Sequence, residues 1–519
     1  MLAIWSPIVK NWWVQGHSDP NRELLDAAAL CRRLVPEGSV EAFLADHRGE
    51  LFPDEMFEDL FTSARGRPSI PSDVVASVMV LQALEGFSDR EAARALCDRI
   101  SWKVACGLAL DDVGFDFTVL TYWRTRLRRS EHPERIFDAV RAVIEATGVL
   151  TGKNRRALDS TLLDDAVATQ DTVTQLIAAI RRVRRVVPGA LDVALSAHDY
   201  DASGKPLIAW DDPVAKADLV NALVTDALAL LGAFEGDTEG TDASTALGLL
   251  ALVAGQDVEQ DDDGTWKIAQ RVAPDRIIST VDPESRHMHK SRSEYRDGYK
   301  AHIAIEPETG LVTAAALTPA NVSDAKTALE LVAAEPGGLE ILGDTAYGSG
   351  ETRAHLRERG HRQLIKPIPL RRSIPGGFSR DDFVVDQAMR TVTCPAGTTV
   401  VISPKGNATF GIKCRGCALR QRCTTAKDGM HLTVHRHDNE LTAARAQWRA
   451  EDGLDDYRQW RPMVERSIAW LVAKGNRRVR FRGVEKNQIG LSLRLAAINL
   501  RRMVNLGLDN DGEWLLRTA

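Results

Sequence analysis

Three acidic residues, far apart in the sequence, have the type and the local context that a divalent-metal site requires. Asp159 and Asp344 each follow a short apolar run that predicts a strand, and Glu465 lies in a predicted helix within a basic stretch. Carboxylates that converge on two ions let one ion activate an attacking oxygen while the other stabilises the leaving oxygen of a phosphodiester. Such hard oxygen ligands suit Mg²⁺ or Mn²⁺. The pattern therefore indicates metal-dependent phosphoryl chemistry.

The local pattern does not support the three carboxylates equally. Asp344 ends the apolar run 339–342 and precedes a Gly-containing turn, so it is either a metal ligand or a helix-capping aspartate. Asp282 ends a similar run, and the spacing alone does not choose between it and Asp159. Glu465 lies at the margin of an apolar helix face, where a surface ion pair is the alternative.

The helix of Glu465 carries a concentrated positive charge. Pro462 suits a first helical turn, which predicts a helix that begins near Arg461 and ends before Gly475. From 457 to 482 there are eight Lys or Arg and one acid, and a second basic cluster lies near 124–129. Phosphate contacts are local, so these clusters predict DNA-backbone binding, with a solvated helix face as the alternative. The predicted DNA-binding residues are Arg124, Arg126, Arg128, Arg129, Arg461, Arg466, Lys474, Arg477, Arg478, Arg480 and Arg482.

The bulk composition is that of an ordinary globular protein of several domains. The chain has 519 residues and a net charge of -6, so the basic clusters are offset by acidic segments elsewhere. No uninterrupted apolar run reaches membrane-spanning length, and no signal peptide is evident, so we expect a cytoplasmic, nucleoid-associated protein that does not enter membranes.

Residues 1–150 are predicted to form an all-α domain. Helices are expected at 72–84 and 118–129, and Ser88 and Glu91 form a capping box that starts another. Short helices with a basic last helix favour a DNA-binding module of the helix-turn-helix type, with a plain helical bundle as the alternative.

Residues 151–519 predict an α/β (α+β) domain interrupted by two insertions. The first strand, 151–165, precedes a helical insertion at about 166–256, and a β-rich insertion occupies about 370–445. Other predicted elements are strands at 266–272 and 276–281, a hairpin of 299–306 with 311–318, a helix at 323–334, a strand at 339–342, a helix at 349–359 and further helices after 455.

Four of the seven cysteines cluster in the β-rich insertion. Cys394, Cys414, Cys417 and Cys423 are separated by 19, two and five residues. A Cys-x2-Cys pair with two flanking cysteines in a small, loop-rich unit predicts a structural zinc site. Free thiols and disulfides are the alternatives.

At these residues the chain resembles the DDE-type transposases of bacterial insertion sequences, in the group with an N-terminal helical domain and a ribonuclease H-like catalytic domain. The segments that carry the resemblance are Pro68–Arg129, Asp282–Arg286, Asp297–His302, Leu317–Asn321, Gly343–Tyr347, Arg461–Arg466 and Asn499–Arg502. The resemblance implies a catalytic triad of Asp159, Asp344 and Glu465, and it decides against Asp282.

The chain departs from one related pattern, which has Tyr, two residues, Arg, three residues, Glu, six residues and Lys. Arg461 fits this pattern, but Tyr457 is one place early, Val472 occupies the lysine position and Lys474 is two places late. The departure puts a specific role for Lys474 in doubt.

The resemblance implies a transposase that binds double-stranded DNA at element ends and in the target, as a homodimer. Metal-activated water would cut the DNA, and the freed 3′-OH would attack the target without a covalent enzyme intermediate. A structure-selective nuclease or resolvase of the same fold is one alternative. A non-catalytic DNA-binding regulator is another, but all three carboxylates are present.

Overall fold

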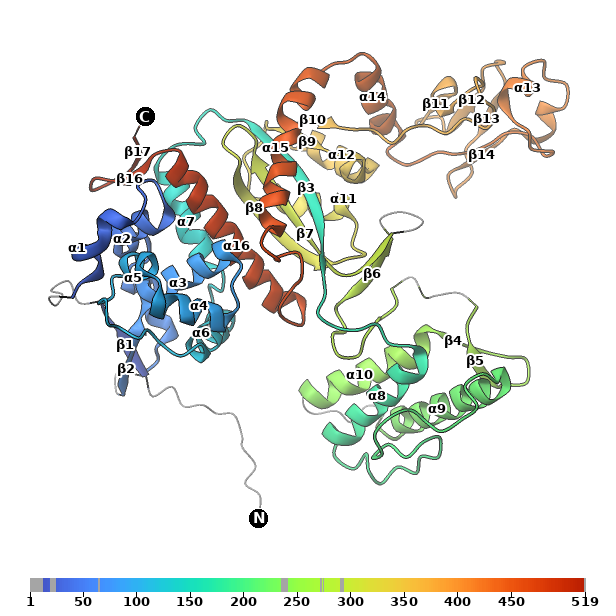
Figure 1. Ribbon diagram of the computed structural model, residues 1–519. Coiled ribbons are helices and arrows are strands. Elements are labelled where there is room, and N and C mark those ends of the chain that lie inside the picture. The colour runs from blue at the N-terminus through green and yellow to red at the C-terminus, as the bar shows by residue number, and fades with distance from the viewer. Residues whose placement is uncertain are drawn as a thin grey trace.

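The computed structural model of the chain describes residues 13–18, 25–63, 66–234, 241–270, 273, 275–289 and 294–517. Helices and strands are mixed, with an N-terminal group of helices, a central sheet flanked by helices, a separate helical unit and a small β-rich unit (Figure 1). Among the described residues, no helix is both long and apolar enough to cross a membrane.

The N-terminal part consists mainly of short helices, and the predicted helices at 72–84 and 118–129 are confirmed. The capping box is also confirmed, because the side chains of Ser88 and Glu91 each accept the other's backbone N–H. The part is not all-helical, since β1 (Trp13–Gly16) pairs in parallel with β2 (Arg67–Pro71). Its helices are α1 (Ala27–Cys31), α2 (Val40–Leu51), α3 (Ser72–Glu85), α4 (Asp89–Asp98), α5 (Ile100–Cys106), α6 (Thr118–Arg129) and α7 (Arg135–Ala146).

The central sheet has six strands, with the path β10-β9-β3-β7-β6 and β8 paired to β7. Strands β9 and β10 run parallel to β3, whereas β7 is antiparallel to β3, β6 and β8. The strands are β3 (Arg155–Asp164), β6 (Arg286–His289), β7 (Tyr295–Glu306), β8 (Leu311–Pro319), β9 (Glu340–Gly343) and β10 (Arg362–Ile365). The predicted first strand, hairpin and 339–342 strand are therefore confirmed.

The predicted strand at 276–281 is wrong. Its backbone donors bind side chains instead of a neighbouring strand: the N–H of Ile277 donates to Gln256 at 2.8 Å and that of Thr280 to Gln170 at 2.8 Å. Ile277 is buried against the helical unit, so its apolar run reflects packing against helices. The predicted 266–272 strand is shorter, as β5 (Trp266–Ile268), and residues 271–272 lie outside the described part.

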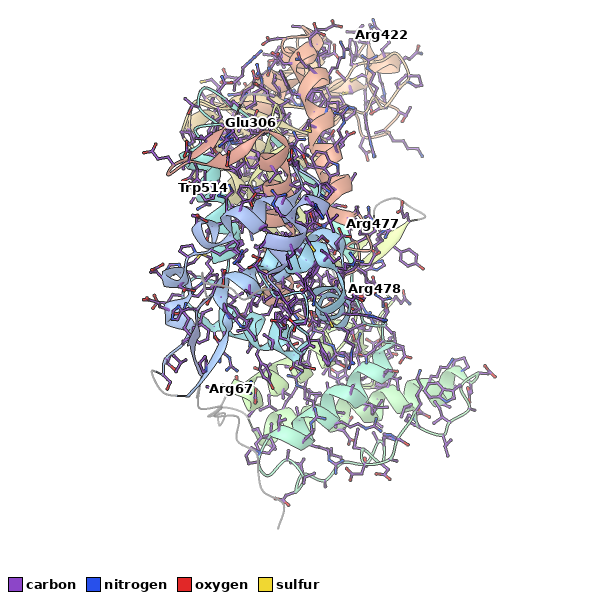
Figure 2. All side chains as sticks on the ribbon, turned by 60° about the vertical axis from the view of Figure 1, so that its left-hand side comes forward. Arg67, Glu306, Arg422, Arg477, Arg478 and Trp514 are labelled. Carbon is purple, nitrogen blue, oxygen red and sulfur yellow. The ribbon has the colours of Figure 1, made fainter. Side chains whose placement is uncertain are left out.

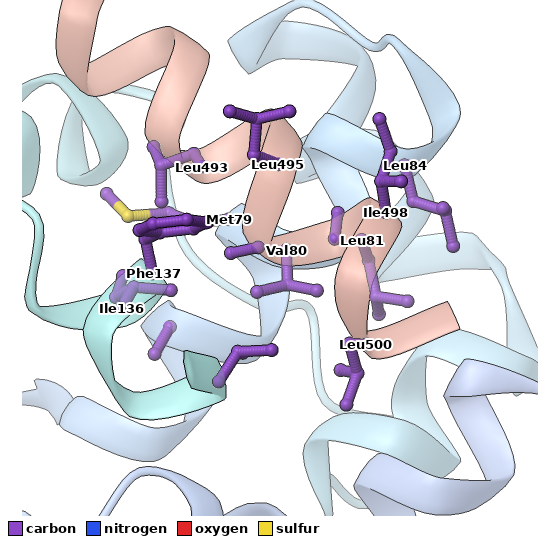
Figure 3. Close-up of a cluster of buried hydrophobic side chains, with 14 of the residues drawn as sticks. Met79, Val80, Leu81, Leu84, Ile136, Phe137, Leu493, Leu495, Ile498 and Leu500 are labelled. Carbon is purple, nitrogen blue, oxygen red and sulfur yellow. The ribbon is translucent and has the colours of Figure 1, made fainter. Parts of the chain in front are cut away.

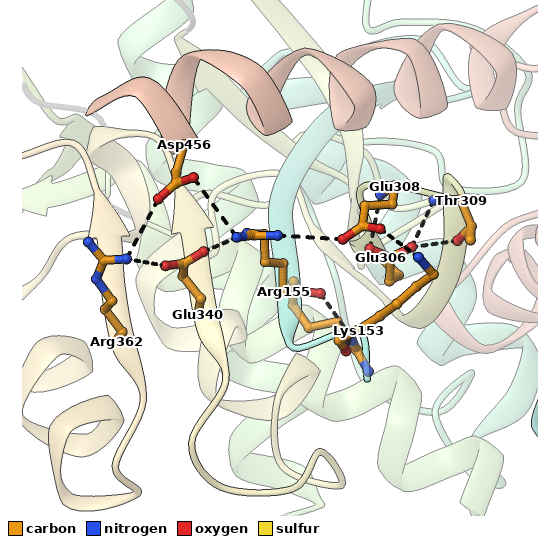
Figure 4. Close-up of polar contacts among 9 residues, drawn as sticks. Lys153, Arg155, Glu306, Glu308, Thr309, Glu340, Arg362 and Asp456 are labelled. Carbon is orange, nitrogen blue, oxygen red and sulfur yellow. Dashed lines mark hydrogen bonds and ion pairs between the residues drawn. The ribbon is translucent and has the colours of Figure 1, made fainter. Parts of the chain in front are cut away.

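Charged side chains fix the register of the three parallel strands. Glu340 on β9 is opposite Arg155 on β3 and Arg362 on β10, and it forms ion pairs with both (Figure 4). Asp456, at the start of α15 (Leu454–Val472), approaches Arg155 at 3.9 Å and Arg362 at 3.7 Å. Because cross-strand pairs on one face set register, this cluster aligns the strands and places α15 over them.

Helix α15 begins at Leu454, seven residues before the predicted start, and Pro462 lies inside it. The sequence interpretation assigned the proline to the first turn. The actual first turn contains Asp455 and Asp456, whose charges favour a helix N-terminus. The loss of one backbone hydrogen bond at Pro462 is compatible with the helix because the helix packs along β3.

The two faces of the sheet pack against different helices. Leu158 and Ile341 point toward α11 (Asp324–Leu331) and α12 (Gly350–Glu358), whereas the alternate residues Ala157 and Leu342 join a larger core with α15 and α16 (Val484–Asn505). That larger core also contains the N-terminal helices, and Figure 3 shows α16 packed on α3 and α7. The N-terminal helices and the sheet thus share one hydrophobic core.

The two insertions have their own small cores. The helical unit contains α8 (Thr172–Val186), α9 (Pro213–Ala233) and α10 (Thr241–Gln256), followed by the β4 (Val258–Gln260) and β5 hairpin. The β-rich unit contains β11 (Val384–Asp386), β12 (Thr391–Thr393), β13 (Thr399–Val401), β14 (Asn407–Thr409), α13 (Arg420–Cys423) and β15 (His431–Thr433), and it leads into α14 (Asp438–Arg449). Strands β16 (Leu508–Asn510) and β17 (Trp514–Leu516) follow α16. The predicted domain boundaries stay predictions.

Asn499 of α16 provides a test of how the sheet is attached to this helix. Its amide accepts the N–H of Val312 on β8 at 2.8 Å and donates to the Val312 carbonyl at 2.8 Å. We expect Asn499→Leu to lower the free energy of unfolding by about 2–4 kcal/mol, because two buried backbone groups lose their partner. Urea unfolding measures the change. The half-exposed Arg501→Ala control should shift it by less than about 0.5 kcal/mol, and equal shifts would contradict the role of Asn499.

Candidate active site

Asp159 lies on β3, and Asp344 directly follows β9, the parallel strand beside it. The β3–β9 register pairs Ala157 with Leu342, and continuing it by two residues places Asp159 opposite Asp344. The N–H of Ser160 donates to Asp159 at 2.9 Å, and the N–H of Ala346 donates to Asp344 at 2.9 Å. Each carboxylate is thus oriented by a backbone group nearby, and each keeps oxygen lone pairs for another partner.

An arginine of α15 neutralises Asp159. Arg461 Nη2 lies 3.1 Å from Asp159 Oδ2, and the two side chains are 9% and 17% exposed. Burial raises the pKa of Asp159 above its usual range; the charge of Arg461 opposes this shift, and the nearby charge of Asp344 adds to it. Two carboxylates so close together favour a shared cation, and Arg461 supplies one.

Glu465 lies one turn after Arg461 on α15 and is exposed. Helix α15 packs along β3, the strand of Asp159. Within the described ranges, no three or more Asp, Glu, His or Cys side chains are arranged as a formed metal site. The structure therefore brings Asp159 and Asp344 together and places Glu465 on the adjoining helix.

Asp282, the rival of Asp159, is 1% exposed and its two oxygens are already engaged. The hydroxyl of Tyr299 donates to Oδ2 at 2.6 Å, and the N–H of Gly483 donates to Oδ1 at 3.2 Å. These bonds hold the residue that precedes α16. The geometry favours a structural role for Asp282.

A buried polar group on the other face of the sheet was missed in the sequence. Asp324, at the start of α11, accepts from the Ser160 hydroxyl at 3.0 Å and lies 3.2 Å from Lys300 Nζ and 3.4 Å from His302 Nδ1. Burial, helped by the charge of Lys300, lowers the pKa of His302 to about 3, so the imidazole is neutral at ordinary pH. Lys300 and His302 are two apart on a strand and share a face, a signal that could have identified them.

The predicted DNA-binding arginines of α6 differ in their contacts. Arg124 forms an ion pair with Asp89, and Arg128 lies 3.2 Å from Glu485. The guanidinium of Arg126 stacks on the ring of Phe61, 4.9 Å from its centroid. Arg129 is exposed. Much of this positive charge is thus engaged within the protein.

The basic segment after α15 contacts the turn between α3 and α4. Lys474 lies 3.0 Å from Glu85, and Arg480 donates to the carbonyls of Gly86 and Phe87. A Cβ at Gly86 would lie 2.4 Å from the carbonyl oxygen of Lys474, and the φ of Gly86 is +72°, so only glycine fits there.

The arginines next in this segment contact the end of β3. Arg477 donates to the Leu162 carbonyl at 3.2 Å, and Arg478 donates to the Asp165 carbonyl at 3.3 Å. Figure 2 shows Arg477 and Arg478 close together at one edge of the molecule. Arg466 and Arg482 are exposed and carry the charge that remains open to a partner.

The four clustered cysteines line one cavity of about 20 Å³ in the β-rich unit. Burial raises the pKa of Cys423, and the charges of Cys414, Cys394 and Cys417 raise it further.

Two family models match separate parts of the chain. The model described as "Transposase DDE domain" matches residues 393–504, which include the four cysteines, Glu465 and nearly all of α16. The model described as "Transposase domain (DUF772)" matches residues 31–126, from the end of α1 into α6. No curated protein and no solved structure matches the chain.

Replacing Arg461 tests whether Asp159 and Asp344 form a cation site. Arg461→Met leaves two adjacent carboxylates without a cation, so we expect the free energy of unfolding to fall by about 3 kcal/mol. Added Mn²⁺ should restore up to about 2.7 kcal/mol at one hundred times its dissociation constant. Thermal unfolding with and without Mn²⁺ measures both effects.

The control for this experiment is Arg466→Met, which removes an exposed arginine of the same helix. It should leave both stability and the Mn²⁺ response close to those of the unaltered protein. A Mn²⁺ shift that persisted in the double variant Asp159→Asn with Asp344→Asn would show that the ion acts somewhere other than these two carboxylates.

Proposed function

We propose that this chain, which carries two transposase domains and belongs to the DDE transposases of insertion sequences, catalyses metal-dependent DNA strand cleavage and strand transfer at the ends of its element. The observation that carries the proposal is the pair of carboxylates Asp159, on β3, and Asp344, directly after the parallel strand β9, beside a helix that bears Glu465. The family matches supply the reaction class, and the carboxylates supply the residues.

The strand order supports a ribonuclease H-like catalytic domain. An antiparallel trio, β8-β7-β3, is extended by the parallel strands β9 and β10. The acids lie within the central strand, after the adjacent strand and on a later helix, as the resemblance implies. The N-terminal helices, joined by the short β1–β2 pair, are proposed to recognise DNA.

Asp159 and Asp344 suit a hard divalent ion, because both are carboxylates, the oxygen ligands that such ions prefer. Asp344 is partly exposed, so an ion there could also keep water ligands. Bound Mg²⁺ or Mn²⁺ would activate the attacking oxygen and stabilise the leaving oxygen. Asp159 and Asp344 would hold the ions, with Glu465 as the third ligand. Arg461 keeps the buried Asp159 paired in their absence.

Two in-line displacements then occur at the same carboxylates. In the first, water adds to a phosphorus at the element end, the P–O3′ bond breaks and a 3′-OH is released. In the second, that 3′-OH forms a bond to a target phosphorus, and the target's own 3′ oxygen leaves with a proton. The first step converts one phosphodiester into a phosphomonoester and a free 3′-OH, and the second exchanges one phosphodiester for another. Neither step needs an added nucleotide, and neither forms a covalent bond to the protein.

DNA is the proposed partner, and backbone contacts would come from the exposed basic residues near the site. Arg466 and Arg482 flank the segment that joins α15 to α16. Pairing of two element ends implies a homodimer, and work on chromosomal DNA implies the nucleoid.

Asp344→Asn tests the catalytic assignment. We expect cleavage of a labelled element end in Mg²⁺ to fall at least about 10³-fold, because the lost charge acts on the transition state. End binding, measured by fluorescence anisotropy, should stay within about twofold, since phosphate contacts come from other residues. Glu358→Gln, an exposed acid of α12, is the matched control.

The same assay distinguishes a transposase from a nuclease or resolvase. A transposase joins the freed 3′ end to a second DNA, whereas a nuclease or resolvase of this fold leaves cleaved ends or rejoins them at a junction. If Asp344→Asn cut the end as fast as the unaltered protein, the assignment of Asp344 would be wrong.

Salt dependence tests the proposed DNA contacts. Each lost phosphate contact should lower the slope of log affinity against log salt by about 0.9, so Arg466→Ala and Arg482→Ala should each reduce it by about that amount. Arg141→Ala removes a half-exposed arginine of α7 that interacts with Asp138 and Glu145, and it should leave the slope unchanged. Equal slopes for all three variants would exclude Arg466 and Arg482 as phosphate contacts.

A further inference from the structure

Three separate segments of the β-rich unit bring their cysteines to one point. Cys394 directly follows β12, Cys414 and Cys417 lie in a turn after β14, and Cys423 ends α13. All four line the cavity of about 20 Å³, which is room for a single small atom or ion. Cys394 and Cys423, which are 29 residues apart in the sequence, therefore line the same cavity.

The backbone at residues 429 and 430 lies close to the Cys414 sulfur. The N–H of Met430 donates to Cys414 Sγ at 3.5 Å, a contact that stabilises negative charge on sulfur. A Cβ at Gly429, whose φ is +88°, would lie 2.6 Å from the Gly411 carbonyl oxygen and 3.2 Å from Cys414 Sγ. Only glycine lets the chain approach the sulfur so closely.

Tight turns present the other thiols. The N–H of Gly397 donates to the Cys394 carbonyl at 2.8 Å, and the N–H of Cys417 donates to the Cys414 carbonyl at 3.4 Å. Both turns bring their cysteines to the wall of the cavity. The remaining walls are largely apolar, with the aromatic rings of Phe378, Phe383 and Phe410 among them.

The core of this unit is small for an independently folded region. Its named strands are three residues long, and its buried core contains Phe383, Val392, Val400, Ile402, Ala408, Phe410, Leu432 and Val434. Units with so little buried apolar surface commonly need a covalent or metal cross-link. The cavity lies where such a cross-link would tie β12, α13 and the turn after β14 together.

We propose that Cys394, Cys414, Cys417 and Cys423 bind one structural Zn²⁺ as four thiolates. Four cysteines around one cavity supply the four-sulfur ligand set that a tetrahedral structural Zn²⁺ takes. Among the described residues these thiols are not grouped as a formed metal site. Thiolates favour Zn²⁺ over Mg²⁺, so this ion differs from those proposed at Asp159.

The zinc would stabilise the fold of the β-rich unit, which contacts α14. Arg445 and Arg449 of α14 both form ion pairs with Asp381, and Arg380 pairs with Asp438. These contacts join the unit to α14, which precedes the helix of Glu465. A four-thiolate site has no open position for substrate, so its role is structural.

Metal analysis of the full-length protein tests this inference. Purified in reductant without added zinc, the protein should carry one zinc per chain by mass spectrometry of its metals. The double variant Cys414→Ser with Cys417→Ser should lose at least about nine-tenths of it, because two of the four ligands are gone. The control Cys97→Ser, which alters an exposed cysteine of α4, should retain the full amount.

A second measurement does not depend on the folding of a variant. A mercurial reagent added to the unaltered protein should release zinc in proportion to four reacted thiols, and Co²⁺ exchanged into the site should show the absorption of a tetrahedral thiolate complex. Asp344→Asn should keep its zinc, which separates this site from the proposed catalytic one.

Two results would overturn the proposal. One is zinc-free protein whose four thiols are freely titratable or joined as disulfides. The other is zinc that survives the loss of Cys414 and Cys417, since the ion would then be held elsewhere.

Discussion

The charged cluster centred on Glu340 is the constraint on which the site depends. Glu340 lies between Arg155 and Arg362 on the flanking strands, and a shift of either strand by one residue would turn these charges to the opposite face. The same register, continued four residues beyond the Arg155–Glu340 pair, puts Asp159 beside Asp344. Asp456 reaches the cluster from α15, so the alignment of the strands also determines where Arg461 and Glu465 lie. Lys153, Glu308 and the turn that Glu306 closes through Thr309 extend the cluster to the β7–β8 hairpin.

Helix α16 makes the N-terminal helices and the sheet one packed body. Arg494 donates to the carbonyls of Leu84 at the end of α3 and of Trp470 in α15, and burial lowers its pKa to about 10. One buried side chain therefore joins three helices, and Asn499 joins the same helix to β8. The edge of the sheet proposed to be catalytic and the helices proposed to bind DNA are thus held in a fixed relation, as positioned phosphodiester chemistry requires.

The sequence was sufficient for elements whose pattern is local. The capping box at Ser88, the hairpin and the strand before Asp344 depend on neighbouring residues, and the structure has all three. The start of α15 was not predictable from Pro462, because the helix is stabilised by Asp456, whose partners are about 95 and 300 residues away. The apolar run before Asp282 resembled a strand, but its burial comes from α8–α10. For the same reason, Asp159 and Asp282 could not be separated by pattern: only the contacts of Tyr299 and Gly483 with Asp282 show that its oxygens are engaged.

The helical unit of α8–α10 is inserted between β3 and β6. The segments that connect it to these two strands are held by hydrogen bonds. The hydroxyl of Ser285 donates to Asp165, while Tyr299 holds Asp282. Its apolar residues are buried largely against one another. The entropic cost of closing a loop rises only by about 0.6 kcal/mol for each doubling of its length. The length of an insertion whose two ends are held in this way therefore has little effect on the stability of the strands it separates. A change in the length or sequence of this segment should therefore alter the outline of the protein without moving Asp159, on the strand before it, from its place beside Asp344.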